Sequence, residues 1–140
     1  MTHTLPAFSA QDALVAIMVT VSISDESIRT SELVAIERQV NHLPIFAGYD
    51  MDAVREVAQT VYKIMEDEDG LDTLFAMVRD ALAERLWETA YALACDVAAA
   101  DGSLRQEELR LLEEVRHELN VERLHAAAIE WGARVRHLTL

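Results

Sequence analysis

The scarcity of helix-breaking residues limits the fold of this chain more than any other feature of its sequence. Its 140 residues include only two prolines and four glycines, so long segments run without interruption. Within these segments apolar residues recur every three or four positions, which is the spacing of one face of a helix. The sequence therefore predicts an all-α protein, a compact bundle of about seven helices joined by short loops.

Local start and stop signals place the expected helices. Ser9 is a residue type that caps helix N-termini, and the position before Pro44 is biased away from helical backbone. The acidic run 66–69 and Gly70 interrupt the apolar pattern, so Asp72 is the expected cap of the next helix. The expected helices are 9–23, 30–42, 50–65, 72–82, 84–100, 106–119 and 121–135.

Apolar positions also indicate how these helices pack. Helix 84–100 is apolar around most of its circumference, with Asp96 as the exception, so we expect it at the centre of the bundle. Helix 106–119 is amphipathic. Its expected inward residues are Leu109, Leu112, Val115 and Leu119. In helix 121–135 the apolar positions are Leu124, Ala127, Ala128, Trp131 and Val135, and we interpret Trp87 and Trp131 as large residues of the core or its rim.

A stretch of the chain is repeated. Residues 13–40 align with residues 89–116 at an offset of 76. The identical pairs are Ala16 and Ala92, Val21 and Val97, Asp25 and Asp101, Ser27 and Ser103, Arg29 and Arg105, Glu32 and Glu108, Leu33 and Leu109, and Glu37 and Glu113. In each copy an apolar helical run stops at an acid and a second helix follows, so the predicted fold contains a pseudo-twofold repeat of a helix-turn-helix unit.

Length and charge define the class of protein. A chain of 140 residues suits one compact domain, 1–140, which buries roughly two thirds of its unfolded surface without disulfides. The formal net charge of −13 disfavours nucleic acid and anionic membrane surfaces as partners, and favours cations and basic proteins. The first residues do not have the pattern of a secretory signal, and no segment has the apolar length of a membrane span. We therefore expect a cytoplasmic protein.

The repeated turn is the motif that could carry chemistry. In the second copy, Asp101 ends a helix, Gly102 can adopt left-handed backbone, and Glu108 falls in the first turn of the next helix, where the helix dipole favours a carboxylate. In the first copy, Asp25 and Glu32 match, but Glu26 replaces the glycine.

These residues resemble the tellurite-resistance TerB family, whose members have an apolar Ala-rich helix, then Ala-Asp-Gly-x-Leu or Ile, and a Glu at the start of the next helix. Residues 100–104 with Glu108 fit that pattern closely, and residues 25–28 with Glu32 fit it less well. The resemblance implies an all-α bundle with two related halves, a link to tellurite and other stresses, and a cation site. By matching position, that site would be formed by Asp25, Glu32, Asp101 and Glu108.

Two interpretations of these acids remain open. If pseudo-twofold symmetry brings both turns to one face, four carboxylates would suit a hard divalent cation such as calcium, magnesium or manganese. Alternatively, each Asp only ends a helix, and each Glu serves a helix dipole or pairs with Arg29 or Arg105. The turn is not an EF-hand, because Gln106 and Leu112 occupy the positions of its required glycine and bidentate glutamate.

Other candidates for chemistry are weaker. The lone Cys95 lies in an apolar run and is interpreted as a small core residue. The sequence contains no phosphate loop, nucleophile elbow or HExxH motif, and the histidines have no second ligand at metal-binding spacing, so we expect a non-enzymatic protein. An enzyme with paired carboxylates is the least favoured class. A metal-independent module that recruits a basic protein is the main alternative, and a homodimer is a further candidate assembly.

Overall fold

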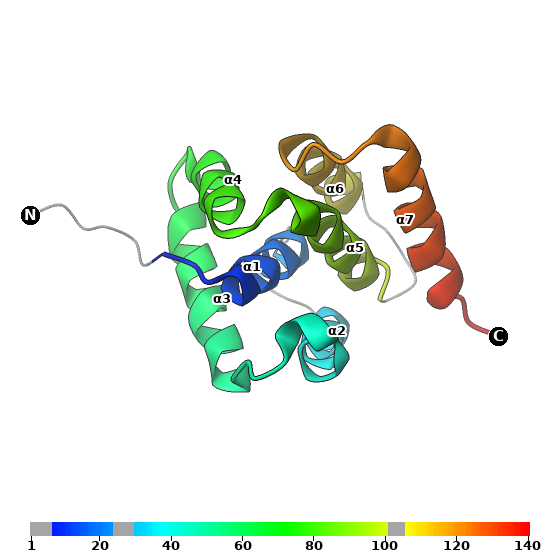
Figure 1. The fold of residues 1–140 in the computed structure, drawn as a ribbon, viewed down its shortest axis with the longest axis horizontal. Helices are drawn as coiled ribbons and strands as arrows, with labels where there is room; N and C mark the ends of the chain where they lie inside the picture. The colour runs from blue at the N-terminus through cyan, green and yellow to red at the C-terminus, as the bar shows by residue number, and fades with distance from the viewer. Residues whose placement is uncertain (1–6, 24–29, 101–105) are drawn as a thin grey trace, which may run out of the picture.

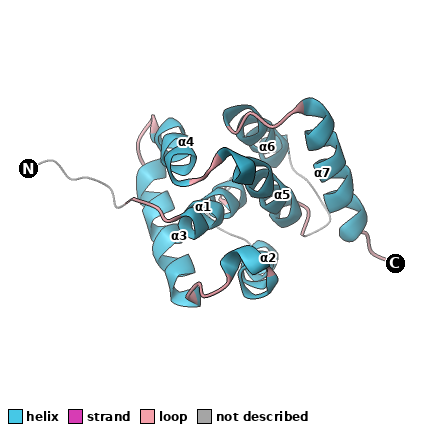
Figure 2. Cartoon of the chain, in the orientation of Figure 1, coloured by secondary structure: helices cyan, strands magenta, loops and turns pink. Residues whose placement is uncertain are grey.

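The computed structural model describes residues 7–23, 30–100 and 106–140, and all regular structure within these ranges is helical (Figure 2). This confirms the predicted all-α class. The helices are α1 (Ala10–Ser22), α2 (Thr30–His42), α3 (Met51–Met65), α4 (Gly70–Ala81), α5 (Trp87–Ala98), α6 (Gln106–Glu118) and α7 (Arg123–Arg136). Two short 3-10 helices, η1 (Pro44–Phe46) and η2 (Glu84–Leu86), precede α3 and α5. No helix within the described ranges combines the length and apolarity needed to cross a membrane.

Local signals fix most helix ends where the sequence predicts them. Ser9 caps α1 in a reciprocal capping box, in which its Oγ accepts from the Asp12 N–H and the Asp12 carboxylate accepts from the Ser9 N–H. Asp50 caps α3 by accepting from the Asp52 N–H at 2.9 Å. Helix α2 ends at His42, as the proline at position 44 predicts.

Two predicted helix starts are wrong. Helix α4 begins at Gly70 and not at Asp72, because the chain turns sharply after α3 and Asp69 takes the N-cap position without a side-chain hydrogen bond. The expected helix 84–100 is divided, since residues 84–86 form the tighter η2 and the α-helix begins at Trp87.

Two apolar helices form the centre of the molecule. Residues 13–22 of α1 are all buried, and α5 buries seven of its residues, as the sequence predicts for a central helix. Helices α1 and α5 pack against each other, and the remaining helices surround them (Figure 1). Helices α3 and α4 cover one side of α1, whereas α7 packs against α5.

Helices α2 and α6 flank this central pair. Both contact α1 and α5, and in Figure 1 they lie on either side of the pair. Helix α2 spans 30–42 and α6 spans 106–118, so their bounds differ by the same 76 residues that relate the sequence repeats. A pseudo-twofold relation between the two complete halves stays a prediction.

One expectation about an inward face is wrong. Leu112, Val115 and Leu119 of α6 are buried, but Leu109 is 46% exposed. In α7 the buried residues are Ala126 and Ala133, Ile129 is partly buried against the core, and Leu124, Trp131 and Val135 are exposed. Small residues let α7 lie close to α5, so the wider apolar face of α7 is left outside.

Candidate functional site

Glu32 and Glu108 are the buried acids of the described part of the chain. Glu32 is the third residue of α2, and Glu108 is the third residue of α6. Their side chains are only 3% and 2% exposed, and one carboxylate oxygen of each, Oε2, has less than 1 Å² of accessible surface. Within the described ranges, no other charged residue is buried to this degree.

Each glutamate lies on the inner face of its helix. Ile36 follows Glu32 by four residues and is fully buried, and Leu112 follows Glu108 by four residues and is 7% exposed. Because residues four apart share one face of a helix, the apolar contacts that seat α2 and α6 on the central pair also draw the two carboxylates inward. Burial therefore follows from the position of each glutamate in its amphipathic helix.

The burial of an acidic side chain makes these two positions unusual. An ionised carboxylate loses much of its hydration on burial, which costs several kcal/mol unless nearby positive charge or hydrogen-bond donors replace the water. The first turn of a helix supplies part of that replacement through its free N–H groups and its dipole. A divalent cation would supply more, and carboxylate oxygens are the ligands that calcium, magnesium and manganese prefer.

The four acids predicted from the sequence are placed only in part. Glu32 and Glu108 occupy equivalent positions on two helices that pack against the same central pair. Asp25 and Asp101 lie outside the described residues, as do the turns to which they belong. Within the described ranges, no three His, Cys, Asp or Glu side chains are grouped as metal ligands.

A second polar cluster centres on Asp96 of α5. Its carboxylate is 2.7 Å from the Arg136 guanidinium and 3.4 Å from the His137 ring, and it accepts from Gln39 at 3.3 Å. Asp96 thus connects α2, α5 and α7. The sequence marks Asp96 as the polar exception in an apolar helix, but its three partners are far away in the chain and could not be identified from spacing.

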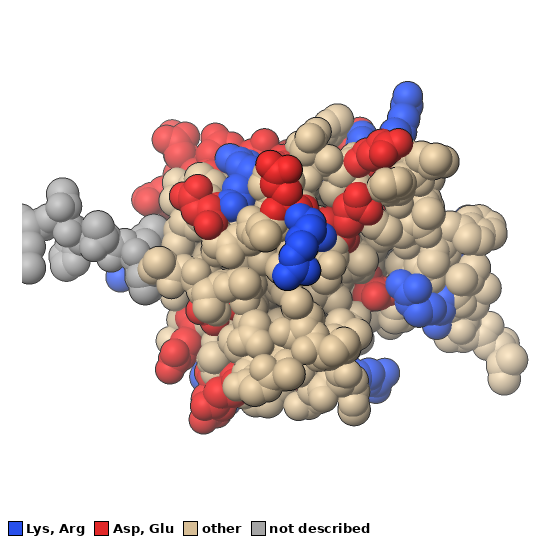
Figure 3. All heavy atoms as spheres, viewed as in Figure 1, with Lys and Arg blue, Asp and Glu red and all other residues tan. Residues whose placement is uncertain are grey.

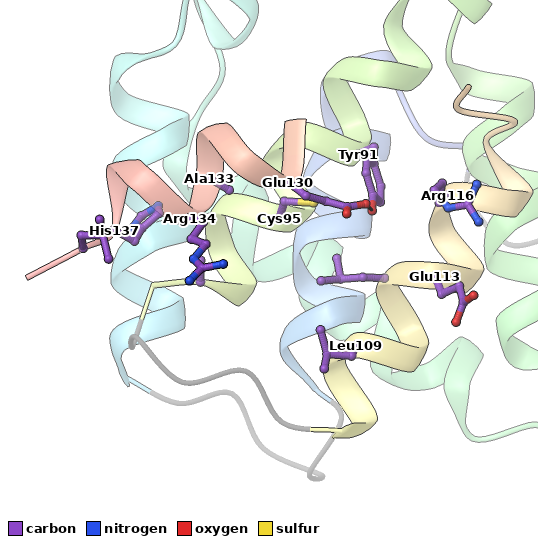
Figure 4. Close-up of a pocket in the computed structure, with 12 residues that line it drawn as sticks. Tyr91, Cys95, Leu109, Glu113, Arg116, Glu130, Ala133, Arg134 and His137 are labelled. Carbon is purple, nitrogen blue, oxygen red and sulfur yellow. Dashed lines mark hydrogen bonds between the residues drawn. The ribbon is translucent and has the colours of Figure 1, made fainter. Parts of the chain in front are cut away.

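A groove with a volume of about 810 Å³ lies between α5, α6 and α7 (Figure 4). Its floor includes Tyr91 and Cys95 of α5. The Tyr91 hydroxyl donates to Glu130 of α7 at 2.5 Å, and burial together with this bond raises the pKa of Tyr91. Burial also raises the pKa of the Cys95 thiol to about 12, and Cys95 belongs to the buried core, as the sequence predicts.

The groove was not predicted from the sequence. Its rim combines Leu109 and Arg116 of α6 with Arg134 and His137 of α7 (Figure 4). Leucine, arginine and histidine all occur commonly at exposed helix positions, so these residues do not by themselves indicate a groove. Only the spacing between α6 and α7 turns them into the walls of a groove, and no local pattern encodes that spacing.

The fold and the buried acids define a class of protein: an acidic all-helical domain in which two surrounding helices each have a buried glutamate in the first turn. The family described as tellurite resistance protein TerB matches residues 11–130. The chain belongs to this family, which confirms the resemblance seen in the repeated turn. No curated protein and no solved structure matches the chain.

Proposed function

We propose that this chain is a non-enzymatic, cytoplasmic TerB-family protein of the tellurite and stress response. It binds a divalent cation through the acids at the starts of α2 and α6. The site residues are Asp25, Glu32, Asp101 and Glu108. The observation that carries the proposal is the matched burial of Glu32 and Glu108, at 3% and 2% exposure, on two helices that pack against the same central pair.

The proposal has a physical basis in the cost of burying carboxylates. The free N–H groups and the dipole at the start of a helix favour a carboxylate at these two positions, but its burial costs hydration that an apolar side chain would not lose. A cation bound to these carboxylates would offset part of that loss. Oxygen ligands from acidic residues favour calcium, magnesium or manganese over softer metals.

Thermal unfolding with added ions tests this proposal. The midpoint of unfolding should rise with the concentration of calcium, magnesium or manganese relative to EDTA, because a ligand of the folded state stabilises it by mass action. At an ion concentration 100 times the Kd, the added stability would be about 2.7 kcal/mol. The double variant Glu32→Gln/Glu108→Gln keeps the side-chain shape and should lose the shift.

The matched control is the double variant Glu37→Gln/Glu114→Gln, which removes the same charge from exposed positions of the same two helices. It should retain the ion-induced shift. Melts in EDTA establish that each variant is folded. An unchanged midpoint of the native protein at millimolar concentrations of all three ions would contradict cation binding, and so would a shift that survives in Glu32→Gln/Glu108→Gln.

The second candidate is a metal-independent module that recruits a basic partner. The observation in its favour is an exposed run of acids between α3 and α4, residues 66–69, which lies in the region where Figure 3 shows acidic side chains gathered. The same melts separate the two candidates. A shift produced by a lysine-rich peptide in EDTA, without any shift produced by divalent ions, would favour the interaction module.

A further inference from the structure

Helix α7 exposes its large apolar side chains. Leu124, Trp131 and Val135 are 72%, 62% and 46% exposed, and Leu138, just past the end of the helix, is 70% exposed. The opposite face, which packs on α5, has the small residues Ala126 and Ala133. Figure 1 shows α7 at the edge of the molecule, and Figure 3 shows few acidic side chains there. The wider apolar face of this helix therefore has no neighbour within the described structure.

The exposed residues have the spacing of a helix-pairing seam. Leu124, Ala128, Trp131 and Val135 follow one another at intervals of four, three and four. We call these four residues the α7 stripe. An alternation of three and four keeps one line of apolar side chains facing a partner helix, as in coiled coils. Exposed apolar residues that are scattered singly over a surface do not show this alternating spacing.

The α7 stripe is complementary to itself when two copies run antiparallel. If Leu124 faces Val135 of the partner subunit, then Trp131 faces the partner's Ala128. Each Trp131 indole thus lies over the methyl group of the partner's Ala128. At both ends of the seam, a Leu124 side chain contacts a Val135 side chain. A parallel pair would place the two Trp131 side chains against each other and leave a gap between the two Ala128 methyl groups. Packing without gaps favours the antiparallel arrangement.

Charge opposes a contact through α7 less than a contact through an acidic surface. Helix α7 contains three arginines and one glutamate, a formal charge of +2 in a chain whose formal charge is −13. Two copies that approach through α7 therefore meet less repulsion than they would through any acidic face. In the antiparallel register Arg134 flanks the partner's Ala127, and His125 flanks the partner's Gly132, so like charges do not meet. The guanidinium carbon of Arg134 lies 5.6 Å from the centre of the Trp131 ring, and the methylene groups of Arg134 extend the apolar surface beside it.

We propose that two copies of this chain dimerise through antiparallel α7 helices, with Trp131 seated against the partner's Ala128. Helix α7 has 14 residues and a length of about 21 Å. One helix face of this length covers less than the roughly 800 Å² that each partner buries in a standard interface. The dimer is accordingly weak, with a Kd on the order of micromolar.

Sedimentation equilibrium between roughly 1 and 500 μM, a range that brackets a micromolar Kd, tests for the dimer. The native chain should shift from monomer to dimer as its concentration rises. Trp131→Glu should remain monomeric, and since Trp131 is 62% exposed this variant should fold normally. Leu33→Glu is the matched control. Leu33 is an exposed apolar residue of α2, at 40% exposure, and its replacement should leave the dimer unchanged.

Cysteine cross-linking tests the orientation. In the antiparallel register, Leu124→Cys and Val135→Cys should cross-link when the two variants are mixed and oxidised. Neither should cross-link to itself, since like positions lie about 11 residues, or roughly 16 Å, apart along the seam. Cys95 is buried and does not interfere. Cross-linking of each single variant with itself would indicate a parallel pair and overturn the proposal. A native chain that stays monomeric throughout the concentration range would overturn it as well.

Discussion

Gly70 lies where two segments of the backbone approach closely. It follows the acidic run that ends α3 and is the first residue of α4. A Cβ atom at this position would overlap the Ile64 carbonyl oxygen and would lie 2.9 Å from the Met65 Cα. Both obstacles are backbone atoms that cannot move aside as a flexible side chain would. Close approach of two chain segments, and not a left-handed backbone, explains the glycine.

Gly70→Ala should therefore destabilise the protein by about 1 to 3 kcal/mol, since the added methyl group forces the α3–α4 corner apart. Chemical denaturation measures the change. Gly132→Ala in α7 is the control, because a Cβ there meets only the end of the Arg136 side chain, at 3.1 Å. That substitution should raise stability by up to about 1 kcal/mol through higher helix propensity. Equal effects of the two substitutions would refute the explanation by close approach.

The candidate acids show how far a sequence can specify single residues. The repeat indicates Glu32 and Glu108 as equivalent positions, and the first turn of a helix is where a carboxylate is favoured. Their burial could not be predicted, because it depends on how α2 and α6 lie against α1 and α5. Asp96 is the opposite case, in which the sequence marks an exception but its partners Arg136 and Gln39 become visible only in three dimensions.

Helix α7 is held on α5 by polar contacts at both ends as well as by its small apolar residues. His125 Nδ1 lies 2.9 Å from the Glu88 carboxylate, and its Nε2 lies 3.6 Å from Glu122. At the other end, Arg136 contacts Asp96 at 2.7 Å. The hydrogen bond that the His125 ring donates to the Glu88 carboxylate, followed by the charges of Glu88 and Glu122, raises the pKa of His125 above 6.5.

A pH titration of His125 followed by NMR should show this raised pKa. Glu88→Gln should bring it back toward 6.5, and Glu122→Gln should lower it less, because Glu122 is farther from the ring. The sign of the linkage follows. A pKa raised in the folded state makes charged His125 stabilising below pH 6.5, and this contribution is lost as the pH rises through the folded value. A pKa at or below 6.5 in the native chain would rule out the contact with Glu88.

Helix ends were predicted better than helix faces. Ser9, Asp50 and the proline at position 44 act through neighbouring backbone, so the ends they set agree with the sequence. The buried face of α7 was not predicted, because an amphipathic pattern shows that one face is apolar without showing which surface will cover it. Helix α7 packs closely on the central helix α5 because the residues that it buries there, Ala126 and Ala133, are small.

The whole molecule carries an excess of negative charge. Its formal net charge is −13, and a run of four exposed acids lies between α3 and α4. Like charges at this density destabilise the compact state, because unfolding moves them apart. Dissolved salt screens them over a Debye length of about 8 Å at physiological ionic strength.

The midpoint of thermal unfolding should accordingly rise when KCl is increased from about 10 to 150 mM, a range in which the Debye length falls from roughly 30 to 8 Å. EDTA in the buffer separates this effect from specific ion binding. Glu66→Gln/Glu68→Gln should be more stable than the native chain at low salt and should respond less to KCl. A midpoint that falls with added salt would show that favourable ion pairs outweigh the repulsion.

The sequence by itself determined the helical class, most helix ends, the central place of α5 and the family of the chain, because each depends on residues close together in the chain. Only the tertiary structure decided which face of α7 is buried, where the groove opens, and that Glu32 and Glu108 are enclosed. These features arise where distant segments meet. Their energies depend on the fit between surfaces, which no local spacing of residues encodes.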